Sequence, residues 1–458
     1  MRSRAQPATT PSLVHSRQSG CQQQSDSLLR VPAAKPLRIA WLGPTPGGYA
    51  GVRGVAAELL GGLARAGHEI DCFFPAAEDQ THVRIAGDEQ VTFGEGNLAF
   101  GENVTFIWGT SRWQWNRWYS RGKVAAFASG MLARGVASVR LRREIARRHR
   151  REPYDLVYQF SNIETPGLPP SVARAVPLVI HPETHIAGEL RWLIAERRLC
   201  LRCQPSYIFV IVATIMCVRA LVQRRAIRRA SLLICISSVF RDHLVHDYGF
   251  PLRRTLVVPN PMRTERFSST PDRVGDGPPT VLVLGRISTR KGVEDVVAVA
   301  RVLLERGVEV RVRVVGGPSL WSDYTRLLDD LPANAEYAGH MSAAEIPAEL
   351  ARTDVLLQAS KYEPFGLTVA EALAAGVPVV ATSEVGAIEG VDRAAAAEVA
   401  PGDVEGMATA ISEMLAALEQ KPTELRALAR SEAERLFAPE VICEQISAAL
   451  ERLVDSVV

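Results

Sequence analysis

The sequence lacks the cysteine pattern of a secreted scaffold. Its seven cysteines are irregularly spaced and odd in number, which argues against a disulfide framework and favours a reducing compartment, the cytoplasm. Residues 1–35 contain no apolar stretch typical of a signal peptide and are rich in Ser, Gln and Pro, so we interpret them as a disordered tail, with a misplaced start codon as the alternative. Cys200 and Cys203 form a C-x-x-C without a second pair. We favour two ordinary thiols there, with a zinc site as the alternative.

Internal repeats, heptads and long hydrophobic runs are also lacking. No period of about 20–50 residues recurs, which argues against solenoid and propeller folds. Residues 207–218 form an apolar segment closed by Arg219, and they are fewer than the roughly 20 that a membrane-spanning helix requires. We therefore expect this segment to belong to a buried core.

Charge of one sign does not dominate the whole chain, but it does dominate each half. The formal net charge of +3 combines 29 basic and 18 acidic residues over 36–260 with 19 basic and 31 acidic residues over 261–458. Residues 224–229 and a predicted helix through 140–151 are especially rich in arginine. Basic surface beside apolar surface is typical of proteins that bind an anionic leaflet, so we expect peripheral contact with the inner face of a membrane through the N-terminal half, and no nucleic-acid partner.

Buried strands alternate with amphipathic helices along the rest of the chain. The length suffices for two domains with separate cores, and alternation of this kind predicts parallel sheets. We expect an α/β fold of two Rossmann-like, doubly wound domains facing each other across a cleft, where ligands bind beyond the carboxyl ends of the strands. Predicted strands lie within 37–43, 68–74, 154–160, 177–181, 231–237, 255–260, 280–287, 309–317, 334–340, 353–360 and 377–382.

The predicted domain boundaries follow changes in composition. A tail of 1–35 precedes an N-terminal domain of 36–261, and the turn-rich, charged residues 262–279 form a linker. The second domain comprises 280–438. Residues 439–458 form an amphipathic helix whose position would let it cross back to the first domain.

The stretch S-K-Y-E-P-F-G-L-T-V-A-E, residues 360–371, places one acid before a helix and another inside it. Thr368 and Glu371 have the spacing of a capping box, and Glu363 could only complement the helix dipole. However, a helix that opens on Gly366 exposes backbone amides suited to phosphate or sugar oxygens, and carboxylates accept hydrogen bonds from sugar hydroxyls. The stretch therefore indicates a pocket for a molecule that carries both phosphate and sugar.

The second domain opens on L-G-R-I-S-T-R-K-G. Arg286 follows a strand that ends at Gly285, and Lys291 lies at the start of the next helix. Such a pair can converge on one diphosphate, Arg by its planar fork and Lys as a point charge. The alternative is two solvated basic residues in a loop.

Together these motifs resemble the family 4 glycosyltransferases of the GT-B fold (glycosyltransferases group 1). The resemblance covers residues 36–450. It is carried by G-R-x-x-x-x-K-G at 285–292, E-x7-E with F-G-L at 363–371, P-N-P-M-R-T-E-R-F at 259–267, V-V-G-G at 314–317 and G-H-E at 67–69.

The resemblance implies a role for each matching residue of the second domain. Arg286 and Lys291 would hold the donor diphosphate, Glu363 would contact the transferred sugar, and Glu371 would accept from the ribose. The amides of the F-G-L segment would line the phosphate–sugar pocket, and the turn around His340 and Met341, at the end of the strand at 334–340, would border the base. The donor-binding residues so implied are Gly285, Gly317, His340, Met341, Phe365, Gly366, Leu367 and Glu371.

In the first domain the resemblance implies a glycine-rich loop, Gly47, Gly48 and Gly51, close to the diphosphate and acceptor. A histidine after a strand would touch the donor sugar. His181 matches best, and His185 competes with it. The sequence departs from the family in placing Tyr49 and Ala50 between glycines. It also has Asn260-Pro261 where Asn-Gly is typical, which we expect to affect the linker more than the site.

The implied activity is that of a retaining hexosyltransferase that uses a nucleotide-diphosphate sugar as co-substrate and a glycan or lipid-linked acceptor. The chain has no Asp-x-Asp that would hold a metal ion, so we expect the cations to serve instead, with no cofactor. A nucleotide-sugar epimerase and a non-catalytic nucleotide-sugar-binding protein remain alternatives. A dehydrogenase is disfavoured because the first turn lacks G-x-G-x-x-G.

Overall fold

The computed structural model describes residues 35–47, 51–74, 100, 102–108, 124–161, 168–267, 277–318 and 324–456, with backbone only for 124–135. Residues from Pro36 onward form one unit. The predicted tail therefore lies almost wholly outside the described residues, as does part of the predicted linker.

The first half of the chain forms a seven-stranded parallel sheet in the order β3-β2-β1-β4-β5-β6-β7. Six of its strands lie where the sequence predicts them, and β3 was not predicted. The strands are β1 (Arg38–Leu42), β2 (Glu69–Phe74), β3 (Val104–Trp108), β4 (Leu156–Phe160), β5 (Leu178–His181), β6 (Leu232–Cys235) and β7 (Thr255–Val257).

Helices connect these strands. They are α2 (Gly51–Arg65), α3 (Val124–Arg151), α4 (Pro170–Ala175), α5 (Ile186–Ala195), α6 (Arg197–Cys203), α7 (Ser206–Ile227) and α8 (Ser238–Tyr248), with a 3₁₀ turn η2 (Leu252–Arg254). One sheet face packs under α2, where Trp41 stacks on Tyr158 with ring centroids 4.8 Å apart. Helix α2 begins four residues before the apolar pattern from which it was predicted, because Gly51 takes φ = 68° and turns the chain into the helix.

The second half forms a six-stranded parallel sheet in the order β10-β9-β8-β11-β12-β13. In each sheet the first strand of that half lies inside the sheet, with the next two strands on one side of it and the later strands on the other. This reversal of strand order is typical of a doubly wound sheet, so the prediction of two Rossmann-like sheets is confirmed. The strands are β8 (Thr280–Leu284), β9 (Arg311–Val315), β10 (Ala335–Gly339), β11 (Val355–Gln358), β12 (Val379–Thr382) and β13 (Ala396–Val399), of which β13 was not predicted.

The helices of the second half are α9 (Val293–Glu305), α10 (Ile346–Leu350), α11 (Leu367–Ala374), α12 (Val404–Gln420), α13 (Pro422–Phe437) and α14 (Pro439–Asp455). Short 3₁₀ turns η3 (Thr289–Lys291), η4 (Thr325–Leu328) and η5 (Gly386–Ile388) complete it. Residues 262–267 of the predicted linker are packed rather than free: Met262 donates its amide to the Phe437 carbonyl at 2.9 Å, and Phe267 is buried.

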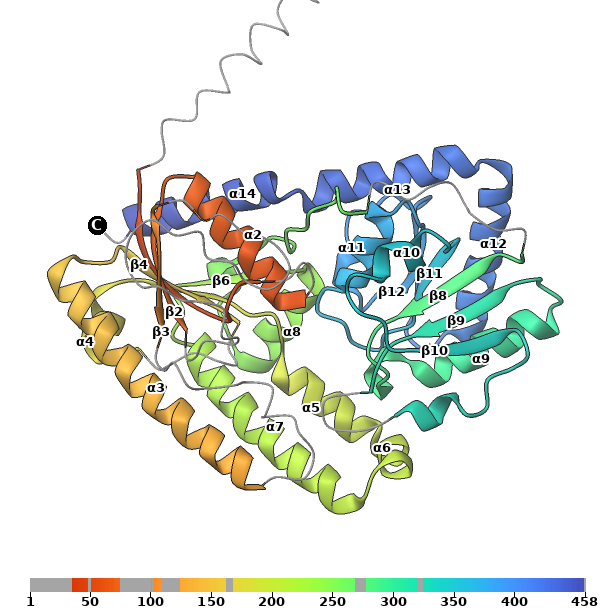
Figure 1. Cartoon of the computed structure of the whole chain (residues 1–458), viewed down its shortest axis with the longest axis horizontal. Helices are drawn as coiled ribbons and strands as arrows, with labels where there is room; N and C mark the ends of the chain where they lie inside the picture. Colours follow the sequence, from red (N-terminus) through yellow and green to blue (C-terminus); the bar gives the residue numbers. More distant parts are fainter. Residues whose placement is uncertain are drawn as a thin grey trace, which may run out of the picture. The chain divides into compact units, whose positions relative to one another are not determined.

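The last helix, α14, lies beside α2 of the first half (Figure 1). Its apolar residues Ile442, Ile446 and Leu450 join the core that contains β1 and β4. His68 Nε2 lies 2.6 Å from Ser447 Oγ. Helix α14 thus ties the end of the chain to the first sheet.

Residues 207–218 contradict the prediction of a buried core segment. They belong to α7, a helix of 22 residues that continues past Arg219 to Ile227. Only Val212 and Met216 of the predicted segment are buried. The twelve-residue count failed because the arginine interrupts the apolar run without ending the helix.

Candidate functional site

The first turn of the second sheet positions the predicted cations. Strand β8 ends at Leu284, and Gly285 and Arg286 follow it; η3 then carries Arg290 and Lys291. At Gly292 the chain takes φ = 67°, and a Cβ there would overlap the carbonyl oxygen of Ala359 after β11. Only glycine fits this crossing, which brings the turn after β8 against the loop after β11.

Glu363, in that loop, contacts two of these cations. Lys291 Nζ forms an ion pair with Glu363 Oε2, and Arg290 Nη1 lies 3.4 Å from the same oxygen. Arg290 also donates to the Tyr362 carbonyl at 3.0 Å. The side chains of Lys291 and Glu363 are largely buried, so the reading of Lys291 as a solvated loop residue is wrong. Arg290 was not among the predicted site residues.

The cations decide the charge of Glu363. Burial alone would raise the pKa of its carboxyl, but Lys291 and then Arg290 outweigh that effect and hold the pKa below its usual value. Burial lowers the pKa of Lys291 while Glu363 opposes the shift. Glu363 is therefore an ionised acceptor, suited to sugar hydroxyls.

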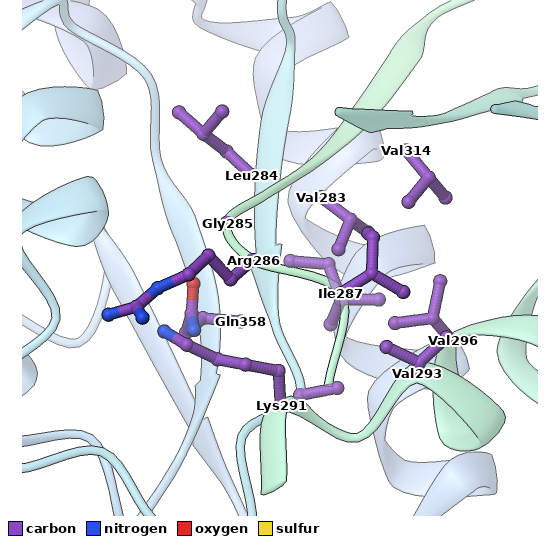
Figure 2. A pocket seen from close by; sticks show the side chains of 12 residues that line it. Val283, Leu284, Gly285, Arg286, Ile287, Lys291, Val293, Val296, Val314 and Gln358 are labelled. Atoms are coloured by element: carbon purple, nitrogen blue, oxygen red, sulfur yellow. The ribbon is translucent and has the colours of Figure 1, made fainter. Parts of the chain in front are cut away.

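Arg286 shares a pocket with Lys291. Gly285, Arg286, Lys291, Gln358 and Ala359 line a small cavity of about 20 Å³ together with apolar residues of the sheet. Figure 2 shows the polar ends of Arg286, Lys291 and Gln358 extending to one side, away from Val283 and Val314. The structure thus brings together the two cations that the sequence predicts for the diphosphate.

The start of α11 has no capping box. Its N-cap is Gly366 at φ = 95°, without a side-chain hydrogen bond. Thr368 Oγ1 instead donates to Gln358 Oε1 at 3.1 Å, which links α11 to the cavity beside Lys291. The capping explanation for Glu371 is therefore wrong, and this buried carboxyl needs another role.

Glu371 lines a second pocket, which is formed by both halves of the chain. This cavity of about 30 Å³ also contacts Gly51 and Gly54 of α2, Arg266 and Leu367. Burial raises the pKa of Glu371 to about 7, and Arg266 opposes the shift. Arg286, Lys291 and Glu363 thus lie together where β8 and β11 end, and Glu371 lies in the pocket that contains Gly51.

His181 and His185 differ in the groups that face their ring nitrogens. His185 Nδ1 lies 2.8 Å from Tyr362 Oη, and its Nε2 lies 3.1 Å from Asp247 Oδ2. His181 Nδ1 lies 2.8 Å from Tyr158 Oη, but its buried Nε2 has no hydrogen-bond partner. Burial lowers the pKa of His181 to about 3, so its imidazole is neutral. The Nε2 atoms of both rings are buried without a hydrogen-bond partner, and that of His185 has the nearer carboxylate, so both histidines stay candidates for contact with the donor sugar.

Glu183 and Asn260 extend the polar group around His181. Asn260 Nδ2 donates to Glu183 Oε2 at 2.8 Å, and Glu183 Oε1 lies 3.8 Å from His181 Nε2 without a hydrogen bond. Burial raises the pKa of Glu183 to about 7. Asn260 is thus part of this buried polar group. Glu183 and Asn260 lie 77 residues apart in the sequence. The sequence therefore offers no local signal for this pair except that an acid, Glu183, follows His181 by two residues.

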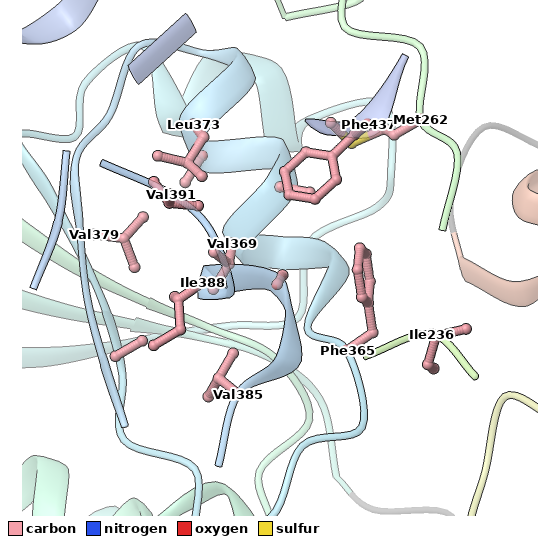
Figure 3. Packing of buried hydrophobic residues seen from close by; sticks show 14 of the residues in the cluster. Ile236, Met262, Phe365, Val369, Leu373, Val379, Val385, Ile388, Val391 and Phe437 are labelled. Carbon is pink, nitrogen blue, oxygen red and sulfur yellow. The ribbon is translucent and has the colours of Figure 1, made fainter. Parts of the chain in front are cut away.

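The remaining predicted residues have mixed placements. Gly317 lies against His340: a Cβ at Gly317 would lie 3.4 Å from Nδ1 of the His340 ring. Met341 packs partly against the core. Phe365 turns its ring into that core, edge-on to Phe437 at 5.7 Å, as Figure 3 shows, so only its backbone could face a ligand.

The N-terminal loop is described in part. Gly47 donates its amide to the Arg53 carbonyl at 3.3 Å, and Gly51 lies in the pocket with Glu371. Gly48 lies outside the described residues. Among the residues that the structure describes, no group of three or more His, Cys, Asp or Glu side chains could hold a metal ion. Cys200 Sγ accepts from Tyr324 Oη at 3.3 Å.

Two family models match the chain, one on each half. The model described as Glycosyltransferase Family 4 matches residues 49–266, and Glycosyl transferases group 1 matches residues 278–417. The mannosylfructose-phosphate synthase of Agrobacterium fabrum is 30% identical over 173 residues, which are 34% of this chain and 38% of that enzyme. The chain thus spans well under two thirds of that relative's length.

Solved structures share the fold. A sucrose-phosphate synthase from Thermosynechococcus elongatus aligns with a TM-score of 0.62 at 18% identity, covering 92% of this chain and all of that one. The Anabaena protein HepE, in complex with UDP-glucose, aligns with a TM-score of 0.54 at 18% identity, covering 91% of this chain and all of that one. Two sheets of GT-B topology, with a family model on each, leave one assignment: the chain belongs to the family 4 glycosyltransferases of group 1.

Proposed function

We propose that this chain transfers a hexose from a nucleotide-diphosphate sugar to a glycan or lipid-linked acceptor, with retention of anomeric configuration and without a metal ion. The observation that carries the proposal is the contact of Lys291 and Arg290 with Glu363, beside Arg286, where β8 and β11 end. Ligands of doubly wound sheets bind at such strand ends. Family membership and the UDP-glucose complex of a protein of this fold support the donor class.

The proposed donor site separates charges by task. The diphosphate lies on Arg286 and Lys291, which stabilise the negative charge that accumulates as the nucleotide leaves. Glu363 is then the acceptor for the sugar hydroxyls, and its ionised state suits that role because a carboxylate offers only acceptors. Glu371, in the pocket with Gly51, accepts from the ribose. His181 offers its neutral Nε2 to the sugar.

Metal independence rests on the same cations. The sequence has no Asp-x-Asp, and three basic side chains, Arg286, Arg290 and Lys291, gather around the turn after β8. Fixed cations aimed at the leaving group lower the barrier in the way that a bound metal would. Retention follows from the family resemblance: attack on the oxocarbenium-like carbon from the face of the departing phosphate needs no carboxylate nucleophile.

A donor screen followed by a transfer assay tests the proposal. The chain is heated with UDP-glucose, UDP-galactose, UDP-N-acetylglucosamine, GDP-mannose and ADP-glucose, and a donor should raise the melting temperature in proportion to the logarithm of its concentration. Release of the free nucleoside diphosphate from that donor should persist in excess EDTA. Loss of release in EDTA, restored by Mn²⁺ or Mg²⁺, contradicts metal independence. Conversion of the donor sugar with the nucleotide still attached indicates an epimerase instead.

The proposed location is the cytoplasm, with peripheral contact to an anionic membrane through the basic first half of the chain. The exposed arginines at the end of α3 and α7 support it. A polyanionic or lipid-linked acceptor would be concentrated by the same surface.

A further inference from the structure

Helix α7 carries an apolar face that nothing in the described part of the chain covers. Of its large residues, Tyr207, Val210, Ile211, Val218, Leu221 and Val222 are exposed. Their spacing of three and four residues places them on one side of the helix. Val222 is 63% exposed and Leu221 60%. We name these six residues the α7 stripe.

The α7 stripe is not ordinary surface. Scattered exposed hydrophobic residues are normal, but a contiguous row marks a site of interaction. Among the described helices, α7 is the one long and apolar enough to cross a membrane by length and composition, and only 17% of its apolar window is buried. A core helix would be mostly buried, so the composition needs another explanation.

Hydrogen bonds fix the opposite face of α7 to the protein. Gln223 is buried, and its Oε1 accepts from the Ile186 amide at 2.9 Å and from Tyr248 Oη at 2.6 Å. Its Nε2 donates to the Thr184 carbonyl at 2.6 Å. Val212 and Met216 pack against Ile186 on the same side. A helix held this way presents one face outward and cannot leave the fold to span a bilayer.

Arginines surround the α7 stripe. Arg202 precedes it on α6, and Arg224, Arg225 and Arg228 follow it, all of them exposed. On one flank a groove of about 830 Å³ contains Val218 and Val222 of the stripe. Its basic lining residues are Arg174, Arg219, Arg225 and Arg229. Among the described residues, no acidic side chain lines this groove, so its charged lining is of one sign.

We propose that α7 lies in the plane of an anionic lipid leaflet, with its stripe among the acyl chains and its arginines, including those of the groove, on the acidic headgroups. An apolar helix face with basic flanks is the arrangement by which proteins enter a leaflet without crossing it. The inference deepens the membrane contact of the proposed function by naming the element that inserts. A second copy of the chain fits less well, because stripe-to-stripe pairing would bring two arginine sets together.

Vesicle flotation tests the insertion. The full chain should float with vesicles of phosphatidylcholine and phosphatidylglycerol and remain in solution with phosphatidylcholine alone. The variant Val210→Gln/Leu221→Gln should bind at least about tenfold more weakly, since it removes apolar area from the leaflet. Leu304→Gln/Val441→Gln is the matched control: both residues are 45% exposed, on α9 and α14, and the variant should float like wild type.

A native thiol reports the depth of α7. Cys217 is exposed on α7, whereas Cys72, Cys200, Cys235 and Cys443 are buried. In a Cys21→Ser/Cys203→Ser background, an environment-sensitive dye on Cys217 should shift to the blue on anionic vesicles and be quenched by brominated acyl chains. A dye that keeps its aqueous spectrum on vesicles that do bind would overturn the insertion and leave a purely electrostatic contact.

The arginines are tested by charge removal. Arg224→Gln and Arg228→Gln should each weaken binding to anionic vesicles about fivefold, as expected for a basic residue near the surface, and raised salt should weaken wild type likewise. Equal binding to neutral vesicles overturns the headgroup part of the proposal. A dimer in solution that Val210→Gln/Leu221→Gln dissociates, without vesicle binding, overturns the proposal in favour of a second copy.

Extraction and an inactive variant complete the test. Alkaline carbonate should release the vesicle-bound chain, and retention would indicate a spanning helix and contradict the in-plane placement. Lys291→Ala should bind vesicles like wild type. Failure of flotation with intact sugar transfer therefore rejects only the membrane inference, and the reverse rejects only the proposed activity.

Discussion

The two sheets share one strand order but differ in charge and in what their helices leave exposed. The first half carries a net excess of basic residues, and its helix α7 leaves a row of apolar side chains uncovered. The second half is acidic overall, yet three of its 19 basic residues, at positions 286, 290 and 291, contact Glu363 or line the pocket beside it. The same architecture thus concentrates charge at one site in the second half and distributes basic residues over a surface in the first half.

The first turns of the two sheets show the same divergence at close range. Gly51 leads into α2 with φ = 68°, and Gly292 leads into α9 with φ = 67°. A Cβ at Gly51 would meet nothing within 4 Å, whereas one at Gly292 would overlap Ala359. The first turn is open beside the pocket of Glu371, and the second is packed against the loop that carries Glu363.

The largest expected effect concerns the ion pair of Lys291 and Glu363. Lys291→Ala and Glu363→Ala should each lower sugar transfer about a hundredfold to a thousandfold, because preorganised groups at a reacting centre have effects of this size. Lys421→Ala removes an exposed lysine that pairs with Glu424 and should leave transfer unchanged. Initial rates at saturating donor, with circular dichroism to check the fold, are the measurement. Wild-type rates in both site variants would show that the charged cluster of the second half is not a catalytic site.

The next prediction compares the two glycines. Gly292→Ala should lower the free energy of unfolding by about 3–5 kcal/mol, because the clash with Ala359 adds to the strain of a left-handed residue. Gly51→Ala should cost only about 1–2 kcal/mol, which is the strain alone. Urea unfolding of both variants decides the matter. Equal losses would show that the packed crossing at Gly292 does not distinguish the turns.

The sequence predicted the second sheet and its cations well because the relevant signals are local. Runs of valine and leucine identified β8, β9, β11 and β12, with shifts of at most three residues at their ends. Strand β13 was missed because its A-A-E-V follows two more alanines, and such an alanine run is typical of a helix. Strand β3 was missed because it is an edge strand that is only half buried.

What the sequence could not predict depends on direction and distance. The turn η3 aims Arg290 at Glu363, and no spacing rule separates Arg290 from Arg286 as the partner of that acid. Glu183 meets Asn260 only through folding. For α7, the sequence shows how apolar the helix is but not which face the protein covers, and that is the property on which the membrane inference depends.

Glu371 gives a prediction about pH. Its pKa is raised to about 7 in the fold from an ordinary value near 4.5, so the folded state holds the proton more tightly than the unfolded state. Stability from this group is therefore full below about pH 4.5 and is lost as the pH rises through 7. Glu371→Gln cannot lose a proton, and relative to wild type it should gain about 1–3 kcal/mol of unfolding free energy between pH 5 and pH 8.

Urea unfolding of wild type and Glu371→Gln at the two pH values isolates this effect, since Glu183 is present in both proteins. The same variant should weaken donor binding if Glu371 accepts from the ribose. A difference in stability that stays constant with pH would mean that Glu371 is not held in a buried pocket between the two halves.

The smallest effect tests the start of α11. Thr368 and Gln358 share a hydrogen bond, so a double-mutant cycle of Thr368→Val and Gln358→Leu should give a coupling of about 0.5–1.5 kcal/mol. The cycle of Thr368→Val and Glu371→Gln should give a coupling near zero, because no capping box joins these two residues. Coupling confined to the second cycle would restore the capping box and return Glu371 to a structural role. Glu371 would then no longer be a ligand-binding acid in the pocket that it shares with Gly51 of the first half.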